Sequence, residues 1–192
     1  QSRRALQHQA GGHEQDDGGA DLNADQHLAK ANGLTRRRVG ACRRGDGRHG
    51  LRAGVRVAIS DNVAGELWAK LVANCAYNAV SAISQLPYGV MIQSPGVREL
   101  VRDVTEEVIA IAKADGIRML PDMLERTYAI AKAMPTQHSS TAQDLARGKP
   151  TEIDHLNGYV VRRGEALGIA TPANRALWAL VKLLEAKALK AK

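Results

Sequence analysis

Phenylalanine is absent from this 192-residue chain, and aromatic residues make up only 3% of it. A hydrophobic core must therefore be built mainly from Leu, Ile, Val and Ala together with two Trp. The two cysteines, Cys42 and Cys75, are too few for a disulfide framework. Cys75 lies in an apolar run, which is typical of a core position and favours a reducing, cytoplasmic setting. No apolar run approaches the length of about 20 residues that spans a bilayer, so we expect no membrane partner.

The composition changes sharply along the chain. Residues 1–57 hold 10 of the 18 glycines and 11 of the 27 Lys and Arg, but no aromatic residue. Neither a helical nor a strand periodicity persists there, and such a composition buries too little apolar surface to offset the entropy of ordering. We therefore expect a disordered or non-native segment over 1–53 and a separate helical domain over 54–192, with a short strand at Val55–Ile59 near its start.

Two interpretations of the first segment stay open. Clusters such as Arg36–Arg38 resemble a basic arm for nucleic acid, but acidic residues are interspersed and no aromatic residue is available for base stacking, so a nucleic-acid partner is not expected. Alternatively, Arg, Gly, Ala, Asp, His and Gln in near-random order are what a GC-rich gene yields when it is read out of frame. In that hypothesis the true reading frame is lost upstream of about Gly54.

From Ser60 onward, helical periodicity alternates with clear stop signals, which predicts an all-α domain of about six helices. Ser, Thr, Asp and Pro mark the expected starts, while Gly and Pro mark the ends. The predicted helices run from Asp61 to about Leu86, from about 96 to 114, from Pro121-Asp122 to before Pro135, from about 139 to 147, from Thr151 to Gly168, and from Thr171-Pro172 onward.

Lys70, Asn74 and Asn78 recur every four residues within the otherwise apolar run DNVAGELWAKLVANCAYNAVSAISQL. On a helix, a four-residue step rotates by only about 40°, so the three side chains form one narrow stripe. A helix that is apolar nearly all round is normally buried, and buried polar groups need partners. We therefore expect a polar ligand against the stripe, unless the Asn residues merely staple helices together and the Lys extends to water.

A second polar group lies in the run HSSTAQDLARGKPTEIDHLNG. Ser140 and Asp144 are four residues apart on one helical face. Glu152 is predicted in the first turn of the following helix, where the helix dipole favours an anion. The two carboxylates are equally compatible with capping or with simple solvation.

These two blocks resemble the C-terminal domain of ketopantoate reductases. The resemblance covers about Gly54 to Lys187 and rests on a W-x-K-L-x-x-N-x-x-x-N helix followed by an S-x-x-x-D…T-E-I-D-x-x-N-G element. It implies a helical domain of the ketopantoate reductase type and an enzyme that reduces a small 2-keto acid, 2-dehydropantoate, to pantoate with NADPH in pantothenate biosynthesis.

The resemblance also implies roles for individual residues. Lys70 would be the general acid that protonates the carbonyl oxygen, because an ammonium stabilises the alkoxide that develops there. Glu152 would lie near this Lys and the cofactor ribose, as a catalytic and cofactor-binding residue. Substrate contacts are implied for Asn74, Asn78, Ser140 and, less directly, Asp144, with a further amide contact from Gln137; no metal is implied.

The family carries a Rossmann domain before this helical domain, with a Gly-rich phosphate loop between a strand and a helix. The G-x-G-x-x-G string at Gly45–Gly50 follows no buried strand, and we interpret it as a chance product of Gly-rich sequence. We therefore expect the substrate half of an active site without its cofactor half, and a chain that is inactive alone. The competing interpretation is a non-catalytic helical module that forms a homodimer or pairs with a separately encoded Rossmann domain.

Overall fold

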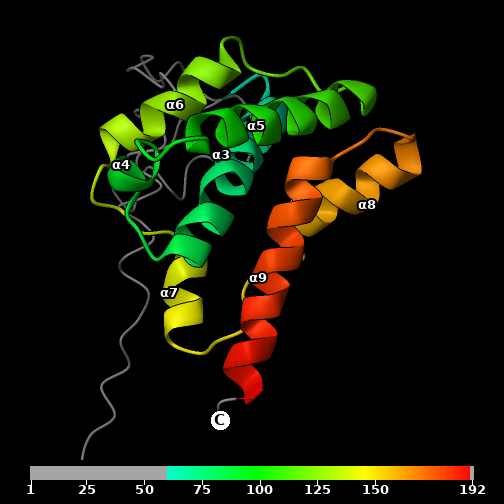
Figure 1. The fold of residues 1–192 in the computed structure, drawn as a ribbon. Coiled ribbons are helices and arrows are strands. Elements are labelled where there is room, and N and C mark those ends of the chain that lie inside the picture. Colours follow the sequence, from blue (N-terminus) through cyan, green and yellow to red (C-terminus); the bar gives the residue numbers. More distant parts are fainter. Residues whose placement is uncertain (1–59, 191–192) are drawn as a thin grey trace, which may run out of the picture.

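A computed structural model of the chain describes residues 60–190, and all regular secondary structure in this part is helical (Figure 1). The all-α prediction is confirmed, although the described residues form seven helices rather than about six. No helix among them is long and apolar enough to cross a membrane. The predicted disorder over 1–53 and the strand at Val55–Ile59 lie outside the described residues. The helices are α3 (Val63–Ser84), α4 (Tyr88–Met91), α5 (Val97–Ala114), α6 (Met123–Ala133), α7 (Ser140–Ala146), α8 (Asn157–Leu167) and α9 (Pro172–Lys190).

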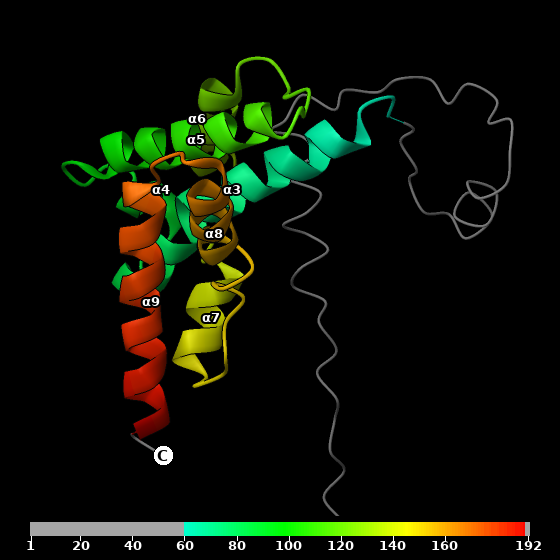
Figure 2. The ribbon, with the colours of Figure 1, turned by 90° about the vertical axis from the view of Figure 1, so that its right-hand side faces the viewer.

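Helix α3 is the centre of the domain. It packs against α5, α7 and α9 and also touches α4 and α6, and in both ribbon views the other helices lie around it (Figures 1 and 2). Its second half is enclosed by the core, where Val72, Cys75 and Ala79 are fully buried. Its first half has one open side, since Val63 is 59% and Leu67 is 63% exposed. The prediction of burial all round this helix is therefore wrong for its first half, because no described element covers that side.

The first turn of α3 is fixed by Asn62 rather than by the predicted cap, Asp61. The Asn62 side-chain oxygen accepts a hydrogen bond from the Gly65 backbone N–H at 3.2 Å, and its amide nitrogen donates to the Arg118 carbonyl at 2.7 Å. One side chain thus caps α3 and ties it to the segment that follows α5. Only glycine fits at position 65, because the Cβ of any other residue would lie 2.4 Å from the Arg118 carbonyl oxygen.

Two other boundaries differ from the sequence prediction. The run after Leu86, expected as a loop, contains the short helix α4. Helix α8 begins at Asn157 instead of just after Thr151. Residues 152–156 form turns, and Leu156, at φ −101° and ψ −103°, interrupts any continuous helix.

A hydrogen-bond network, buried at Asn157 and Asn174 and partly buried at Glu107, joins α3, α5, α8 and α9. The side-chain amide of Asn157 donates to the Cys75 carbonyl at 3.1 Å and to the Asn174 side-chain oxygen at 3.0 Å. Asn174 in turn donates to the Glu107 carboxylate at 2.7 Å, and this carboxylate also accepts the backbone N–H groups of Ala173 and Asn174. Glu107 thus caps the first turn of α9 from α5, at the positive end of the helix dipole.

Candidate active site

The three stripe residues of α3 differ in burial along the helix. Lys70 is exposed, Asn74 is half-buried and Asn78 is only 6% exposed. The Asn78 side-chain oxygen accepts a hydrogen bond from the Tyr88 hydroxyl at 3.4 Å. With its oxygen engaged in this way, Asn78 has its amide hydrogens to offer to another acceptor. The stripe therefore runs from solvent at Lys70 into the core at Asn78.

Ser139 holds the start of α7 against the same stretch of α3. Its hydroxyl donates to the Asn78 carbonyl at 3.1 Å and accepts from the Ala142 N–H at 3.0 Å, which makes it the N-cap of α7. The Ser139 N–H donates to the Ser81 hydroxyl at 3.2 Å, and Ser81 donates to the Leu86 carbonyl at 3.0 Å. Four hydrogen bonds, three of them buried, thus fix where α7 begins.

Ser140 and Asp144 lie on the helix that this anchor positions. Ser140 is the first residue of α7, is exposed, and directly follows Ser139, which is hydrogen-bonded to Asn78. Asp144 is half-buried one turn further on. Ser140 is therefore one residue away from the contact between α7 and the Asn78 backbone, and its role in substrate binding stays a prediction.

Glu152 is exposed and lies in the turns that precede α8, so its predicted place in the first turn of a helix is wrong. The reason lies in its neighbour Thr151, whose N–H and hydroxyl both donate to the Glu185 carboxylate of α9, at 2.8 and 2.7 Å. The Thr151 hydroxyl also accepts the Ile153 N–H at 3.2 Å. The fully buried Ile153 anchors the other side of Glu152 in the core.

Asp154 completes the attachment of this segment to α9. Its carboxylate accepts hydrogen bonds from the Trp178 indole N–H at 2.7 Å and from the Lys182 ammonium at 2.8 Å. The Lys182 hydrogen bond, followed by that of Trp178, holds the pKa of Asp154 below its usual value. Burial alone would raise the pKa of Glu185, but hydrogen bonds from Lys182 and Thr151 outweigh this effect and lower it. Both carboxylates are therefore ionised anchors on either side of Glu152.

The residues that position the site could not be identified from the sequence. Ser139 directly precedes the S-x-x-x-D motif and Asp154 belongs to T-E-I-D, but the spacing of these residues does not indicate which helix each contacts. Tyr88 lay in a segment expected to be a loop, ten residues from Asn78. Gln137 is half-buried, and its side-chain amide donates to the neighbouring His138 carbonyl at 2.8 Å.

The described residues offer little for a dinucleotide. Between residues 60 and 190 there is no strand that could lead into a phosphate-binding loop, and Glu152 is the one position there to which the resemblance gives a cofactor contact. In the same range no three His, Cys, Asp or Glu side chains gather closely enough to hold a metal ion.

The chain belongs to the protein family described as the C-terminal domain of ketopantoate reductase, PanE/ApbA, which it matches over residues 62–185. It is 43% identical over 134 residues to the 2-dehydropantoate 2-reductase of Pyrobaculum aerophilum, covering 70% of this chain and 48% of that protein. A ketopantoate reductase crystal structure from Ralstonia eutropha JMP134 is 59% identical with a TM-score of 0.71, covering 72% of this chain and 47% of that one.

A more distant structure shares the fold. D-mandelate dehydrogenase, solved with NADH and anilino(oxo)acetate, is 24% identical with a TM-score of 0.68, covering 72% of this chain and 59% of that one. The chain thus spans about half the length of the reductases it matches. Two of its structural neighbours, both D-mandelate dehydrogenase, were solved with NADH.

Proposed function

We propose that residues 60–190 form the substrate-binding half of a 2-dehydropantoate 2-reductase site, which works with NADPH and reduces ketopantoate to pantoate. The observation that carries this proposal is the stripe of Lys70, Asn74 and Asn78, with Ser139, the neighbour of Ser140, hydrogen-bonded to the Asn78 carbonyl at its inner end. A 2-keto acid presents one carbonyl oxygen and one carboxylate, and ammonium, amide and hydroxyl donors match both groups.

In this proposal the donors divide the substrate between them. The Asn78 amide and the Ser140 hydroxyl hold the oxygens at the inner end, while Asn74 contacts the middle of the substrate. Lys70, at the open end, gives its proton to the carbonyl oxygen as the carbon is reduced, and its charge stabilises the alkoxide. NADPH supplies the hydride when bound. Glu152 contacts the cofactor ribose, and Asp144 contributes to the substrate pocket.

The open side of α3 forms a second, apolar surface beside the candidate site. Val63 and Leu67 precede Lys70 by two turns and one turn of the same helix face, and both are mostly exposed. Apolar residues in this position fit a domain that covers the cleft and excludes water when the reaction proceeds. In our proposal this is the NADPH-binding domain, supplied by residues outside 60–190 or by another chain. The cytoplasmic location predicted from the sequence suits this reaction.

Two measurements on the purified chain test the proposal. The first is calorimetric titration with ketopantoate, in which Lys70→Ala and Asn78→Ala should each weaken binding about tenfold or more. Lys132→Ala, which removes an exposed ammonium from α6, is the matched control and should leave binding unchanged. Binding that is absent, or unaffected by Lys70→Ala, would contradict the assignment.

The second measurement is NADPH oxidation in the presence of ketopantoate. We expect none from the chain alone, and turnover when a dinucleotide-binding domain of a relative is added. Leu67→Asp should abolish this rescue while leaving ketopantoate binding intact, because a charge on the apolar surface opposes docking. Saturable turnover by the chain alone, lost in Lys70→Ala, would show that the cofactor half is present.

A further inference from the structure

Glu152 is held by its backbone and not by its side chain. Its carbonyl accepts the N–H groups of His155 and Leu156, at 2.8 and 3.2 Å, and so closes the turn that Glu152 begins. Its carboxylate is exposed, and no hydrogen bond or ion pair within residues 60–190 engages it. The backbone of Glu152 is therefore fixed, while the acceptor positions of its carboxylate are not used by these residues.

A closed ring of four side chains flanks Glu152 on both sides. Before it, Thr151 donates through its N–H and its hydroxyl to one oxygen of Glu185. After it, Asp154 accepts a hydrogen bond from the Lys182 ammonium at 2.8 Å. Lys182 also contacts the other Glu185 oxygen at 2.6 Å, which closes the ring. We call this arrangement the Lys182 ring.

Asp154 makes two further contacts beyond the Lys182 ring. Its second carboxylate oxygen accepts the Trp178 indole N–H at 2.7 Å, and its carbonyl accepts the Arg162 guanidinium at 2.7 Å. Trp178 packs closely on glycine at position 158, where a Cβ would lie only 3.0 Å from the indole nitrogen. Asp154 therefore ties the backbone two residues after Glu152 to both α8 and α9.

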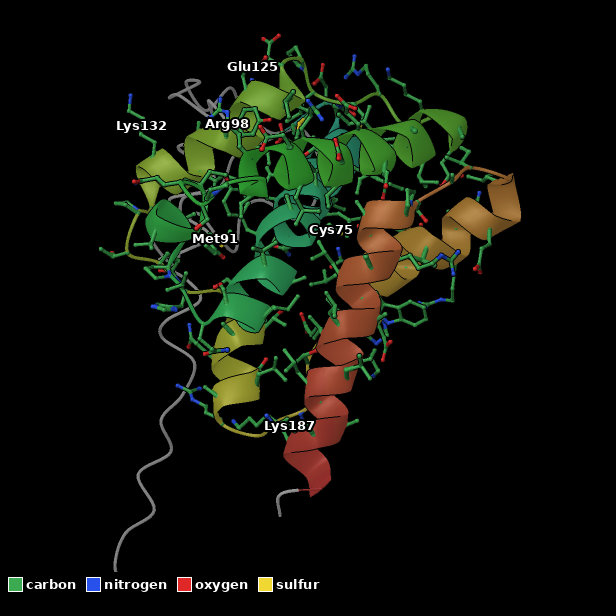
Figure 3. The ribbon with its side chains drawn as sticks, viewed as in Figure 1. Cys75, Met91, Arg98, Glu125, Lys132 and Lys187 are labelled. Carbon is green, nitrogen blue, oxygen red and sulfur yellow. The ribbon has the colours of Figure 1, made fainter. Side chains whose placement is uncertain are left out.

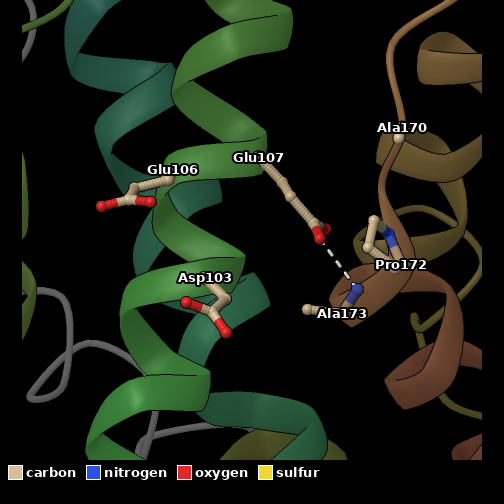
Figure 4. Close-up of a pocket in the computed structure, with 6 residues that line it drawn as sticks. All are labelled: Asp103, Glu106, Glu107, Ala170, Pro172 and Ala173. Carbon is tan, nitrogen blue, oxygen red and sulfur yellow. Dashed lines mark hydrogen bonds between the residues drawn. The ribbon is translucent and has the colours of Figure 1, made fainter.

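Helix α9 is itself a fixed support for the Lys182 ring. At its start, the Glu107 carboxylate of α5 accepts the Ala173 N–H at 2.8 Å (Figure 4). Further along, Leu177 and Val181 are at most 3% exposed in the core. The two α9 residues that contact Asp154 directly follow these two, so their side chains extend from an anchored backbone.

We propose that Asp154 is a positioning residue: with Lys182 it sets the backbone geometry from which Glu152 meets the cofactor. The inference rests on the proposed function, in which Glu152 contacts the cofactor ribose. The Asp154 and Lys182 side chains are each 42% exposed, and ion pairs this exposed contribute little to the stability of a whole domain. A displacement of about 1 Å, by contrast, is enough to weaken a positioned contact strongly. The main consequence of the Lys182 ring is thus local order at Glu152.

A spin label at position 152 tests whether the ring orders this segment. The full chain is labelled as a Cys42→Ser, Glu152→Cys variant, in which Cys75 is buried. Electron paramagnetic resonance then reports the motion of the label. Lys182→Met opens the ring at both carboxylates, and Asp154→Asn opens it at one. Both should shift the spectrum from a restricted to a mobile component, with the larger shift in Lys182→Met.

Lys187→Met is the matched control. Lys187 is an exposed lysine near the end of the same helix, outside the ring (Figure 3), and its substitution should leave the spectrum unchanged. Urea unfolding of each variant separates order from stability. If Asp154 only stabilises the domain, Asp154→Asn will lower the unfolding midpoint while the label in the folded chain stays as restricted as before. That result would overturn the proposal.

The consequence for the cofactor is measured by NADPH oxidation in the mixture of the chain with a dinucleotide-binding domain of a relative. Glu152→Ala should raise the KM for NADPH about tenfold, because it removes a hydrogen bond to a charged acceptor. Asp154→Asn should raise the same KM about threefold in the parent and not at all in Glu152→Ala, because Asp154 acts through Glu152. The KM for ketopantoate should stay unchanged in both.

The outcomes separate this inference from the proposed function. Additive effects of the two substitutions, or a KM for NADPH that only Glu152→Ala changes, would overturn the positioning role of Asp154. A KM that neither substitution changes would overturn the cofactor role of Glu152 in the proposed function. The label spectra depend on neither ketopantoate nor NADPH, so they identify a failure of the ring itself.

Discussion

The side chain of Asn157 links α8 directly to α3 and α9. Its amide group donates two buried hydrogen bonds, to the Cys75 carbonyl at 3.1 Å and to the Asn174 side-chain oxygen at 3.0 Å. Its own side-chain oxygen is buried without a hydrogen-bond partner. Turning the amide over would set this oxygen against two other oxygens, so the two acceptors fix the orientation.

Asn157→Ala removes both donors and leaves two buried acceptors without them, at about 1–1.5 kcal/mol each. The substitution also removes the unpartnered oxygen, which offsets part of the loss, so we expect a net destabilisation of about 2 kcal/mol. Asn157→Asp keeps the shape but places a carboxylate against both acceptors. We expect it to cost about 3–5 kcal/mol at neutral pH, because the buried charge has no cation to meet.

The assay is urea unfolding followed by helical circular dichroism. For a domain of this size the slope is about 2 kcal/mol per M, so the midpoint should fall by about 1 M for Asn157→Ala and by about 2 M for Asn157→Asp. Asn74→Ala, at a half-buried position of α3, is the control and should shift the midpoint by less than about 0.3 M. If Asn157 only fills space, Asp will be tolerated better than Ala, and that order would refute the reasoning.

Three further predictions concern stability and reactivity. Ser139→Ala should lower the free energy of unfolding by about 2 kcal/mol, measured by the same urea titration, because it removes the cap of α7 and the bond to Asn78 together. The pKa of Asp154 is lowered in the folded chain. Its stabilisation is therefore present above the unfolded value of about 3.9 and is lost as the pH falls through the folded pKa. The stability difference between the parent and Asp154→Asn should accordingly shrink between pH 5 and pH 2 in acid titrations, and a constant difference would contradict this. Burial raises the pKa of the Cys75 thiol. In a Cys42→Ser variant, thiol labelling at pH 8 should therefore proceed only as fast as the chain unfolds, whereas rapid labelling of folded protein would show that Cys75 is accessible.

The candidate site could be predicted only in part. That Lys70, Asn74 and Asn78 share one helix face follows from their spacing alone, because the helix geometry is local. Their burial does not follow from it: α3 is open at Lys70 and enclosed at Asn78, and this depends on α4 and α7, which come later in the chain. The placement of α7, and with it Ser140, against α3 rests on a bond between Ser139 and Asn78, which are 61 residues apart.

The sequence by itself determined the fold class, the order of the helices and most of their ends. Gly116, Gly148 and Gly168 take φ of 71°, 64° and 68°, a conformation that favours glycine, so each helix stop could be read within one turn of chain. The tertiary structure alone decided where α8 begins. The capping pattern at Thr151 is a valid local signal, and its hydroxyl accepts the Ile153 N–H. Its own N–H and hydroxyl also donate to the Glu185 carboxylate, 34 residues away, and the helix starts only at Asn157. A partner distant in sequence can outweigh a local preference because a short cap contributes only about 1 kcal/mol, less than the combined bonds and burial that hold this segment to α9.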